Sequence, residues 1–97
     1  CFLNGQHQIL ATEILFEGSL TTSAVYPREV VQRVLDLGAA ALLLAHNHPS
    51  SSTTPSSSDK AVTKKLVTAL GSIDVDVLDH IIVAGAEVFS FADHNLL

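Results

Sequence analysis

Apolar residues recur at helical spacing in two parts of the chain. The first part begins at Pro27, a residue well suited to the first turn of a helix, and ends at Gly38, a residue common just after a helix. The second begins near Ser56 and ends at Gly71. Two amphipathic helices are therefore predicted. Their apolar positions are Val30, Val31, Val34, Leu35 and Leu37 in the first helix, and Val62, Leu66, Ala69 and Leu70 in the second.

Shorter apolar segments predict strands before and between these helices. The segment Phe2-Leu3 precedes Asn4-Gly5, a dipeptide that favours hairpin turns, and a second strand is expected from about His7 to Phe16. A brief strand is predicted at Val25-Tyr26. The uniformly apolar run from Ala39 to Ala45 lies between the helices and predicts a strand that is buried on both faces.

After the second helix, apolar and acidic residues alternate, which predicts a strand with one solvent-exposed face. The run Ile81-Ile82-Val83 is predicted to continue as a buried strand, Gly85 to turn the chain, and Val88 to Phe91 to form the last strand. The order ββ-α-β-α-ββ predicts an α/β sandwich of two or three layers, with a mixed, partly antiparallel sheet flanked by two helices. The alternating residues are Ile73, Asp74, Val75, Asp76 and Val77.

Length and composition fit a single packed domain. The chain has 97 residues, 47% of them hydrophobic, and a mean hydropathy of +0.39, values that exclude a disordered segment. The chain begins without methionine, so we expect residues 1–97 to be one domain of a protein that has further residues before Cys1. The longest apolar run is too short to span a membrane, and a single cysteine fits a reducing compartment, so a cytoplasmic location is expected.

The net charge gives no support to nucleic-acid binding. The sequence has five Lys and Arg residues and ten Asp and Glu residues, so its net charge is −5. Proteins that bind nucleic acid usually carry a basic stripe. The sequence shows no such stripe, although a local basic patch would escape this argument.

The segment HNHPSSSTTPSSSD, residues 46–59, carries the most specific chemistry. Side chains two residues apart in a strand point to the same side, so His46 and His48 can face one ion. Asp59 would return on the loop as a third ligand, and Pro49 and Pro55 would reduce the entropy that is lost on closing the loop. Two imidazoles, a carboxylate and a water form a common catalytic zinc site, in which the water becomes acidic.

The same residues have a simpler interpretation. Segments rich in Ser, Thr and Pro are usually flexible loops. Ser56 and Asp59 have nearly the spacing and chemistry of a capping box, in which both side chains bond the first amides of a helix. Both interpretations stay open on spacing alone. They are also compatible, because a capping serine can lie in an active site.

The segment resembles the JAMM/MPN+ metalloprotease signature, which is H-x-H, seven residues, S, two residues, D. His46, His48, Ser56 and Asp59 match it position for position. The blocks YPREVVQRVL, AHNHPS, PSSSD, DHIIV and SFADHNLL are similar to those of its RadC-like branch, the JAB-domain proteins, and the resemblance covers nearly the whole chain. Ser51 departs from the glycine expected of this branch. The departure concerns the shape of the loop and no ligand.

The resemblance implies a JAMM/MPN fold with α-β-α layering like that of cytidine deaminases. It implies a Zn²⁺ ion held by His46, His48 and Asp59. It also implies that the Ser56 hydroxyl helps to stabilise the oxyanion of a tetrahedral intermediate. The expected activity is zinc-dependent hydrolysis of a peptide or isopeptide bond in an unidentified substrate.

JAMM enzymes also use an upstream glutamate as the general base toward the zinc-bound water. In RadC-like proteins we expect this glutamate a few residues before the CFLN stretch that begins at Cys1. Within the chain the candidates are Glu13 and Glu17, of which Glu17 is the better because a strand is expected to end beside it. The alternative function is a metal-containing module that binds a protein or DNA partner without turnover, in keeping with the historical DNA-repair label of RadC-like proteins.

Asp79-His80 matches the family's DH block and has two interpretations. The carboxylate could orient the imidazole behind a metal ligand. Alternatively, the pair ends a strand and His80 is bonded in the core, which is the interpretation that we prefer. His7 and His94 are expected on the surface.

Overall fold

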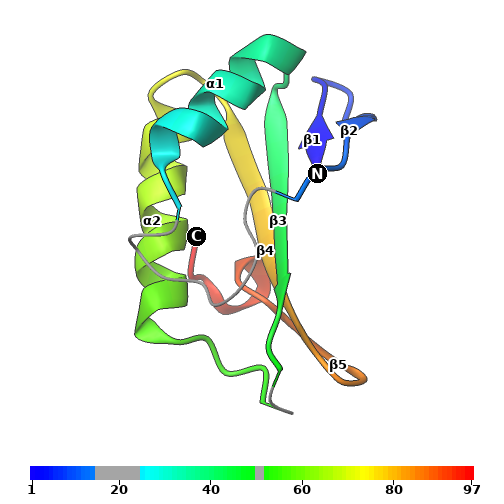
Figure 1. Ribbon diagram of the computed structural model, residues 1–97, viewed down its shortest axis with the longest axis vertical. Coiled ribbons are helices and arrows are strands. Elements are labelled where there is room, and N and C mark those ends of the chain that lie inside the picture. Colours follow the sequence, from blue (N-terminus) through cyan, green and yellow to red (C-terminus); the bar gives the residue numbers. More distant parts are fainter. Residues whose placement is uncertain (15–24, 50–51) are drawn as a thin grey trace.

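The computed structural model describes residues 1–14, 25–49 and 52–97 (Figure 1). These parts of the chain form a five-stranded sheet in the order β2-β1-β3-β4-β5, two helices and a short 3-10 helix, η1. Strands β3 and β4 are parallel and the other neighbours are antiparallel, so the predicted mixed α/β class is confirmed. The elements are β1 (Phe2–Leu3), β2 (Ile9–Ala11), α1 (Pro27–Leu37), β3 (Ala41–Asn47), α2 (Ser57–Gly71), β4 (Asp76–Ala84), β5 (Glu87–Ser90) and η1 (Ala92–His94).

Both helices pack on the same side of the sheet, and Figure 1 shows α1 and α2 together beside β3 and β4. Val30 and Val34 of α1 share one apolar cluster with Phe2 and Leu42 of the sheet. The opposite side is more open, and Val83 of β4 is 38% exposed there. The described elements therefore form two layers, which fits the two-layer alternative. The residues that α2 adds to the cluster are Val62, Leu66 and Leu70.

The helices begin and end where the sequence predicts. Pro27 is the first residue of α1, and Gly38 follows the helix with φ of +66°, a left-handed conformation that glycine adopts without strain. Helix α2 begins directly after Ser56, and reciprocal bonds between Ser56 and Asp59 form a capping box. Among the described residues, no helix has the length and apolar character that a membrane span requires.

Two predicted strands begin too early. Strand β3 begins at Ala41 rather than Ala39. Strand β4 begins at Asp76 rather than Ile73, because the chain first passes through a turn after α2. In that turn the amide of Val75 donates to a carbonyl of the last turn of α2 at 2.9 Å, and the side chain of Val75 is buried in the core. The apolar alternation thus belongs partly to a buried turn.

Three further predictions need correction. His7 has φ of +59° in the turn before β2 and is not part of that strand. Val25-Tyr26 does not form a strand, because Tyr26 is the extended residue that precedes α1. Phe91 lies beyond β5, and η1 was not predicted. Strand β2 ends at Ala11, so residues 12–14 of the predicted second strand are not part of it, and residues 15 and 16 lie outside the described residues.

An irregularity in β4 decides which of its side chains face the helices. Leu42 pairs with Val77, but the next residue, Leu43, pairs with Asp79, so β4 carries one extra residue at this point. Side chains alternate along a strand, and an extra residue reverses the alternation. Val77 and His80, three residues apart, therefore both face the helices.

Candidate metal centre

The three predicted metal ligands come together where the end of β3 meets the first turn of α2. His46 lies near the end of β3, His48 follows the strand, and Asp59 lies in the first turn of α2. The amide of His48 donates to the carbonyl of Val83 on β4 at 2.9 Å, which fixes the chain as it leaves the sheet. One nitrogen or oxygen atom of each ligand side chain lies within 4.8 Å of the other two, so these residues could hold a metal ion.

Asp59 is the buried centre of this group. Its side chain is 2% exposed, and its Oδ2 accepts a hydrogen bond from the Ser56 amide at 2.7 Å. Burial raises the pKa of Asp59, but opposing effects, of which the hydrogen bonds with Ser56 are the largest, more than compensate, so the pKa lies below its usual value. Asp59 is therefore a carboxylate at neutral pH.

His48 presents a lone pair to this carboxylate. Its Nδ1 lies 3.0 Å from the backbone carbonyl oxygen of Ser52, which can only accept a hydrogen bond. Nδ1 of His48 is therefore the donor. In a neutral ring Nε2 then carries a lone pair, and this atom lies 3.1 Å from Asp59 Oδ2.

His46 supplies the observation that points most directly to a cation. Its Nε2 is buried and has no hydrogen-bond partner in the described part of the chain, and it lies 3.3 Å from Asp59 Oδ1. Burial, the largest effect, lowers the pKa of His46, which favours a neutral ring. A buried polar atom without a partner is costly, as is a lone pair that faces a carboxylate oxygen.

A divalent cation would satisfy all of these atoms together. Two neutral imidazole nitrogens and one carboxylate oxygen are the donor set that zinc prefers in hydrolytic sites. The residues of this chain therefore fit the zinc ion that the family resemblance implies. Other divalent metals that accept nitrogen and oxygen ligands would fit the same donor set.

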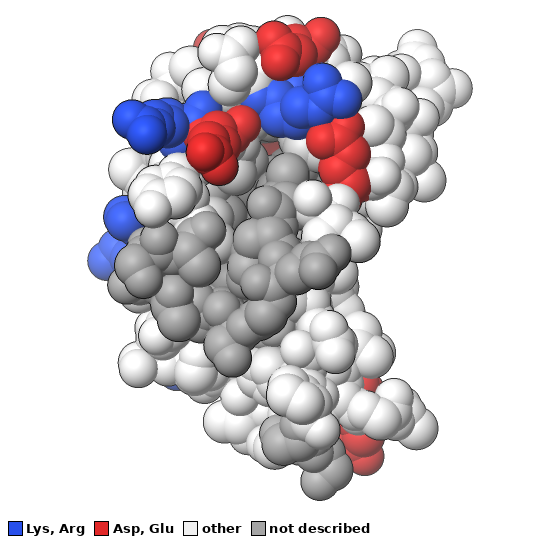
Figure 2. Space-filling model, in the orientation of Figure 1, with Lys and Arg blue, Asp and Glu red and all other residues white. Residues whose placement is uncertain are grey.

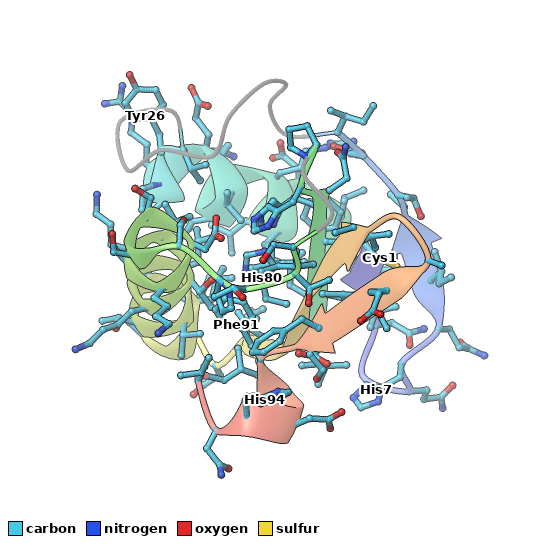
Figure 3. All side chains as sticks on the ribbon, turned by 90° about the horizontal axis from the view of Figure 1, so that it is seen from below. Cys1, His7, Tyr26, His80, Phe91 and His94 are labelled. Atoms are coloured by element: carbon cyan, nitrogen blue, oxygen red, sulfur yellow. The ribbon has the colours of Figure 1, made fainter. Side chains whose placement is uncertain are left out.

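His80 lies behind the group, on β4, and is buried. Its Nε2 lies 2.7 Å from His46 Nδ1, and its Nδ1 lies 2.6 Å from the hydroxyl oxygen of Thr63 on α2. Burial, followed by the nearby His46, lowers the pKa of His80 to about 4, so this ring is neutral at pH 7. Figure 3 shows His80 and Phe91 in the interior of the molecule. Their rings are stacked, with 4.6 Å between centroids.

This arrangement corrects both interpretations of Asp79-His80. His80 is bonded in the core as preferred, but it lies within β4 and not at its end. The Asp79 carboxylate does not orient the His80 ring, because it accepts bonds from the backbone amides of His80 and Ala92 and from the Ser90 hydroxyl. The sequence interpretation missed Thr63. Its signal was the spacing of four residues from Asp59, which places both on one face of α2.

The predicted catalytic residue Ser56 lies beside the three ligands and is exposed. Its hydroxyl oxygen accepts a hydrogen bond from the Asp59 amide at 3.0 Å. The proton of the hydroxyl is therefore not used in that bond. The predicted role of Ser56 toward an oxyanion stays a prediction.

Of the two in-chain candidates for the general base, Glu13 lies among the described residues, and it does not join the metal group. Glu13 forms a two-pronged ion pair with Arg33 of α1, with Nε and Nη2 2.6–2.9 Å from the carboxylate oxygens. The hydrogen bond from Arg33 lowers the pKa of Glu13. Glu17 and the unusual Ser51 lie outside the described residues.

The remaining histidines lie away from this group. His7 and His94 are exposed, as predicted. Figure 3 shows both at the periphery of the molecule, while His80 lies inside. The ring of His94 stacks on Phe89 with 4.1 Å between centroids.

Comparison with known proteins identifies the family. A model of the RadC-like JAB domain matches residues 1–96. The chain is 54% identical over 96 residues to the UPF0758 protein YfjY of Escherichia coli (strain K12), an alignment that covers 99% of this chain and 60% of that protein. It is 55% identical over 96 residues to a UPF0758 protein of Leptothrix cholodnii, with 43% of that protein covered. The chain thus spans less than two thirds of these relatives, and it belongs to the RadC-like JAB domain family, as its motifs predicted.

Proposed function

We propose that this domain is the zinc-binding centre of a hydrolase that cleaves peptide or isopeptide bonds. The observation that carries the proposal is the buried Nε2 of His46, which has no hydrogen-bond partner among the described residues and faces the carboxylate of Asp59. His48 presents its Nε2 to the same carboxylate. When bound, zinc polarises a carbonyl oxygen and makes a water molecule acidic enough to supply hydroxide near neutral pH.

Ser56 completes the part of the reaction that this chain can supply. Its hydroxyl is exposed next to Asp59 and accepts the Asp59 amide hydrogen, and rotation of the hydroxyl can turn its proton toward a substrate oxygen. A donor aimed at an oxygen that gains negative charge stabilises the transition state more than the ground state. We assign Ser56 this role toward the scissile carbonyl.

The general base is a separate proposal. Glu13 is occupied by Arg33, and no glutamate joins the three ligands in the described part of the chain. We assign the role to a glutamate that precedes Cys1 in the longer protein, as the resemblance to JAMM enzymes implies. The whole protein, not this domain alone, is therefore the form expected to turn over substrate.

The alternative function is a metal-containing binding module without turnover, favoured by the absence of a free glutamate at the described part of the site. A nucleic-acid partner has little electrostatic support. Acidic residues outnumber basic ones ten to five, and on the face in Figure 2 the basic side chains near α1 alternate with acidic ones. A protein or peptide partner is consistent with this surface.

Two measurements test the proposal. Elemental analysis of the longer protein after zinc addition is expected to give one zinc per chain, lost in His48→Ala and retained in His94→Ala, the matched control. Quenched fluorescent peptides and isopeptide-linked peptides are expected to be hydrolysed only by zinc-loaded wild type and control. Zinc without hydrolysis would favour the binding module. Retention of the zinc in His48→Ala would overturn the ligand assignment.

A further inference from the structure

We infer that Thr63 and His80 form a directional hydrogen-bond chain that places the ring proton of His46 on Nδ1 and so presents its Nε2 lone pair to the metal. The inference rests on the proposed metal site and adds two positioning residues to it. Both are buried, Thr63 at 0% and His80 at 3% exposure. Solvent therefore does not compete for their hydrogen bonds.

The direction of this hydrogen-bond chain is set at the end away from His46, at the backbone carbonyl of Asp59. The backbone carbonyl oxygen of Asp59 can only accept, and the Thr63 hydroxyl donates to it at 2.7 Å. The single proton of that hydroxyl is then used. Toward His80 Nδ1, 2.6 Å away, the Thr63 oxygen can only accept. His80 must therefore carry its proton on Nδ1.

The same argument about donors and acceptors applies to the His80 ring. A buried imidazole is neutral unless a partner stabilises its charge, and a neutral ring has one N–H. With Nδ1 as donor, Nε2 of His80 is an acceptor. Its neighbour at 2.7 Å is His46 Nδ1, which must therefore donate. The opposite tautomer of His46 would bring two nitrogen lone pairs face to face at this distance.

The hydrogen-bond chain begins and ends at the same residue, Asp59. The Asp59 carbonyl is the last acceptor, and the Asp59 carboxylate faces the His46 Nε2 that the chain leaves unprotonated. The first turn of α2 thus supplies one ligand, the Asp59 carboxylate, and also the backbone carbonyl that ends the hydrogen-bond chain orienting a second ligand, His46. Partners behind metal-bound histidines fix the tautomer and ring orientation in this way.

The first test reads the protonated nitrogen of His46 in the metal-free protein by long-range ¹H–¹⁵N correlation spectroscopy. We expect the proton on Nδ1. A proton on Nε2 would overturn the inference, whatever the metal affinity. Because this readout needs no metal, a protein that bound no zinc would contradict the proposed function alone.

The second test uses matched variants. Thr63→Val removes the hydroxyl at similar shape, and Thr63→Ser retains it. His80→Phe keeps a ring against Phe91, whereas His80→Gln offers an amide oxygen to His46 and an amide hydrogen to Thr63. Zinc affinity, measured by competition with a chelator, is expected to fall about tenfold or more in Thr63→Val and His80→Phe. Thr63→Ser should match wild type, and His80→Gln should recover part of the affinity lost in His80→Phe.

The variants also have a spectroscopic readout that a merely structural role would not change. Thr63→Val is expected to show a mixture of His46 tautomers, while Thr63→Ser keeps one. Unaltered tautomer and zinc affinity in both Thr63→Val and His80→Phe would overturn the inference. If either variant did not fold, the wild-type tautomer would still decide the direction of the chain.

Discussion

The ring of His80 stacks on the ring of Phe91, with centroids 4.6 Å apart and planes inclined by 20°. Phe91 is fully buried and lies between β5 and η1. This last part of the chain therefore packs against His80, whose ring lies within hydrogen-bond distance of His46. The family block SFADHNLL therefore has a physical link to the candidate metal centre. The block supplies no ligand, and its contribution is to the packing behind the ligands.

Truncation of Phe91 is expected to affect stability and metal binding together. Phe91→Ala should lower the free energy of unfolding by about 3–5 kcal/mol, because a buried aromatic ring is replaced by a cavity. Zinc affinity should fall as well, since the His80 ring loses the surface that holds it. Urea unfolding and chelator competition measure the two effects. Phe89→Ala, at a partly exposed ring, is the control, and an equal loss of zinc affinity there would contradict this account.

Asp59→Asn is expected to abolish zinc binding and yet to preserve the metal-free fold. The amide oxygen can still accept the Ser56 hydrogen bond, and the new amide N–H₂ lies where it can donate to the unpartnered His46 Nε2. That bond should stabilise the metal-free protein by about 1 kcal/mol. Urea unfolding with a chelator, and again with zinc, separates the effects. Stabilisation of Asp59→Asn by zinc to the same extent as wild type would show that Asp59 is no ligand.

Ser56→Ala is expected to separate a helix-capping role from a catalytic one. Loss of the cap should cost about 1 kcal/mol of unfolding free energy. Zinc content should not change, because Ser56 is not a ligand, and turnover of the longer protein should fall. Ser57→Ala, at the next exposed residue, is the control for local effects. Unchanged turnover in Ser56→Ala would remove Ser56 from the proposed mechanism.

Asp79 is expected to make stability fall in acid. Burial raises the pKa of this carboxyl, but hydrogen bonds from Ser90, Ala92 and His80 more than compensate, so the folded-state pKa lies below the unfolded value. The unfolded state then binds a proton first as the pH falls. The stabilisation is present above the unfolded pKa of about 3.9 and is lost as the pH falls through the folded pKa.

The Asp79→Asn variant tests this sign. The amide keeps a similar shape, and the Ser90 hydroxyl can turn to accept from it. Urea unfolding between pH 3 and 7, with a chelator present, should show an advantage of wild type that is constant near neutrality and shrinks below about pH 4. A difference between wild type and Asp79→Asn that grew toward low pH would contradict the depressed pKa.

Much of this domain follows from local sequence. Pro27 and Gly38 bound α1 because one fixes a helical φ and the other adopts positive φ. Ser56 and Asp59 start α2 because their side chains bond the first amides of the helix. The pairing of His46 with His48 follows from the alternation of side chains along a strand. Each of these features depends on residues within a few positions, so the printed order of residues is enough to predict them.

Only the tertiary structure decided that His80 and Thr63 lie behind the metal centre. His80 faces His46 because β4 accommodates one extra residue opposite Leu42 and Leu43, and that irregularity reverses its alternation. Without it, His80 would point to the more open side of the sheet. Thr63 meets His80 because α2 packs on the same side. Register and packing join residues far apart in the chain, and their energies depend on all the elements together, so no short segment encodes them.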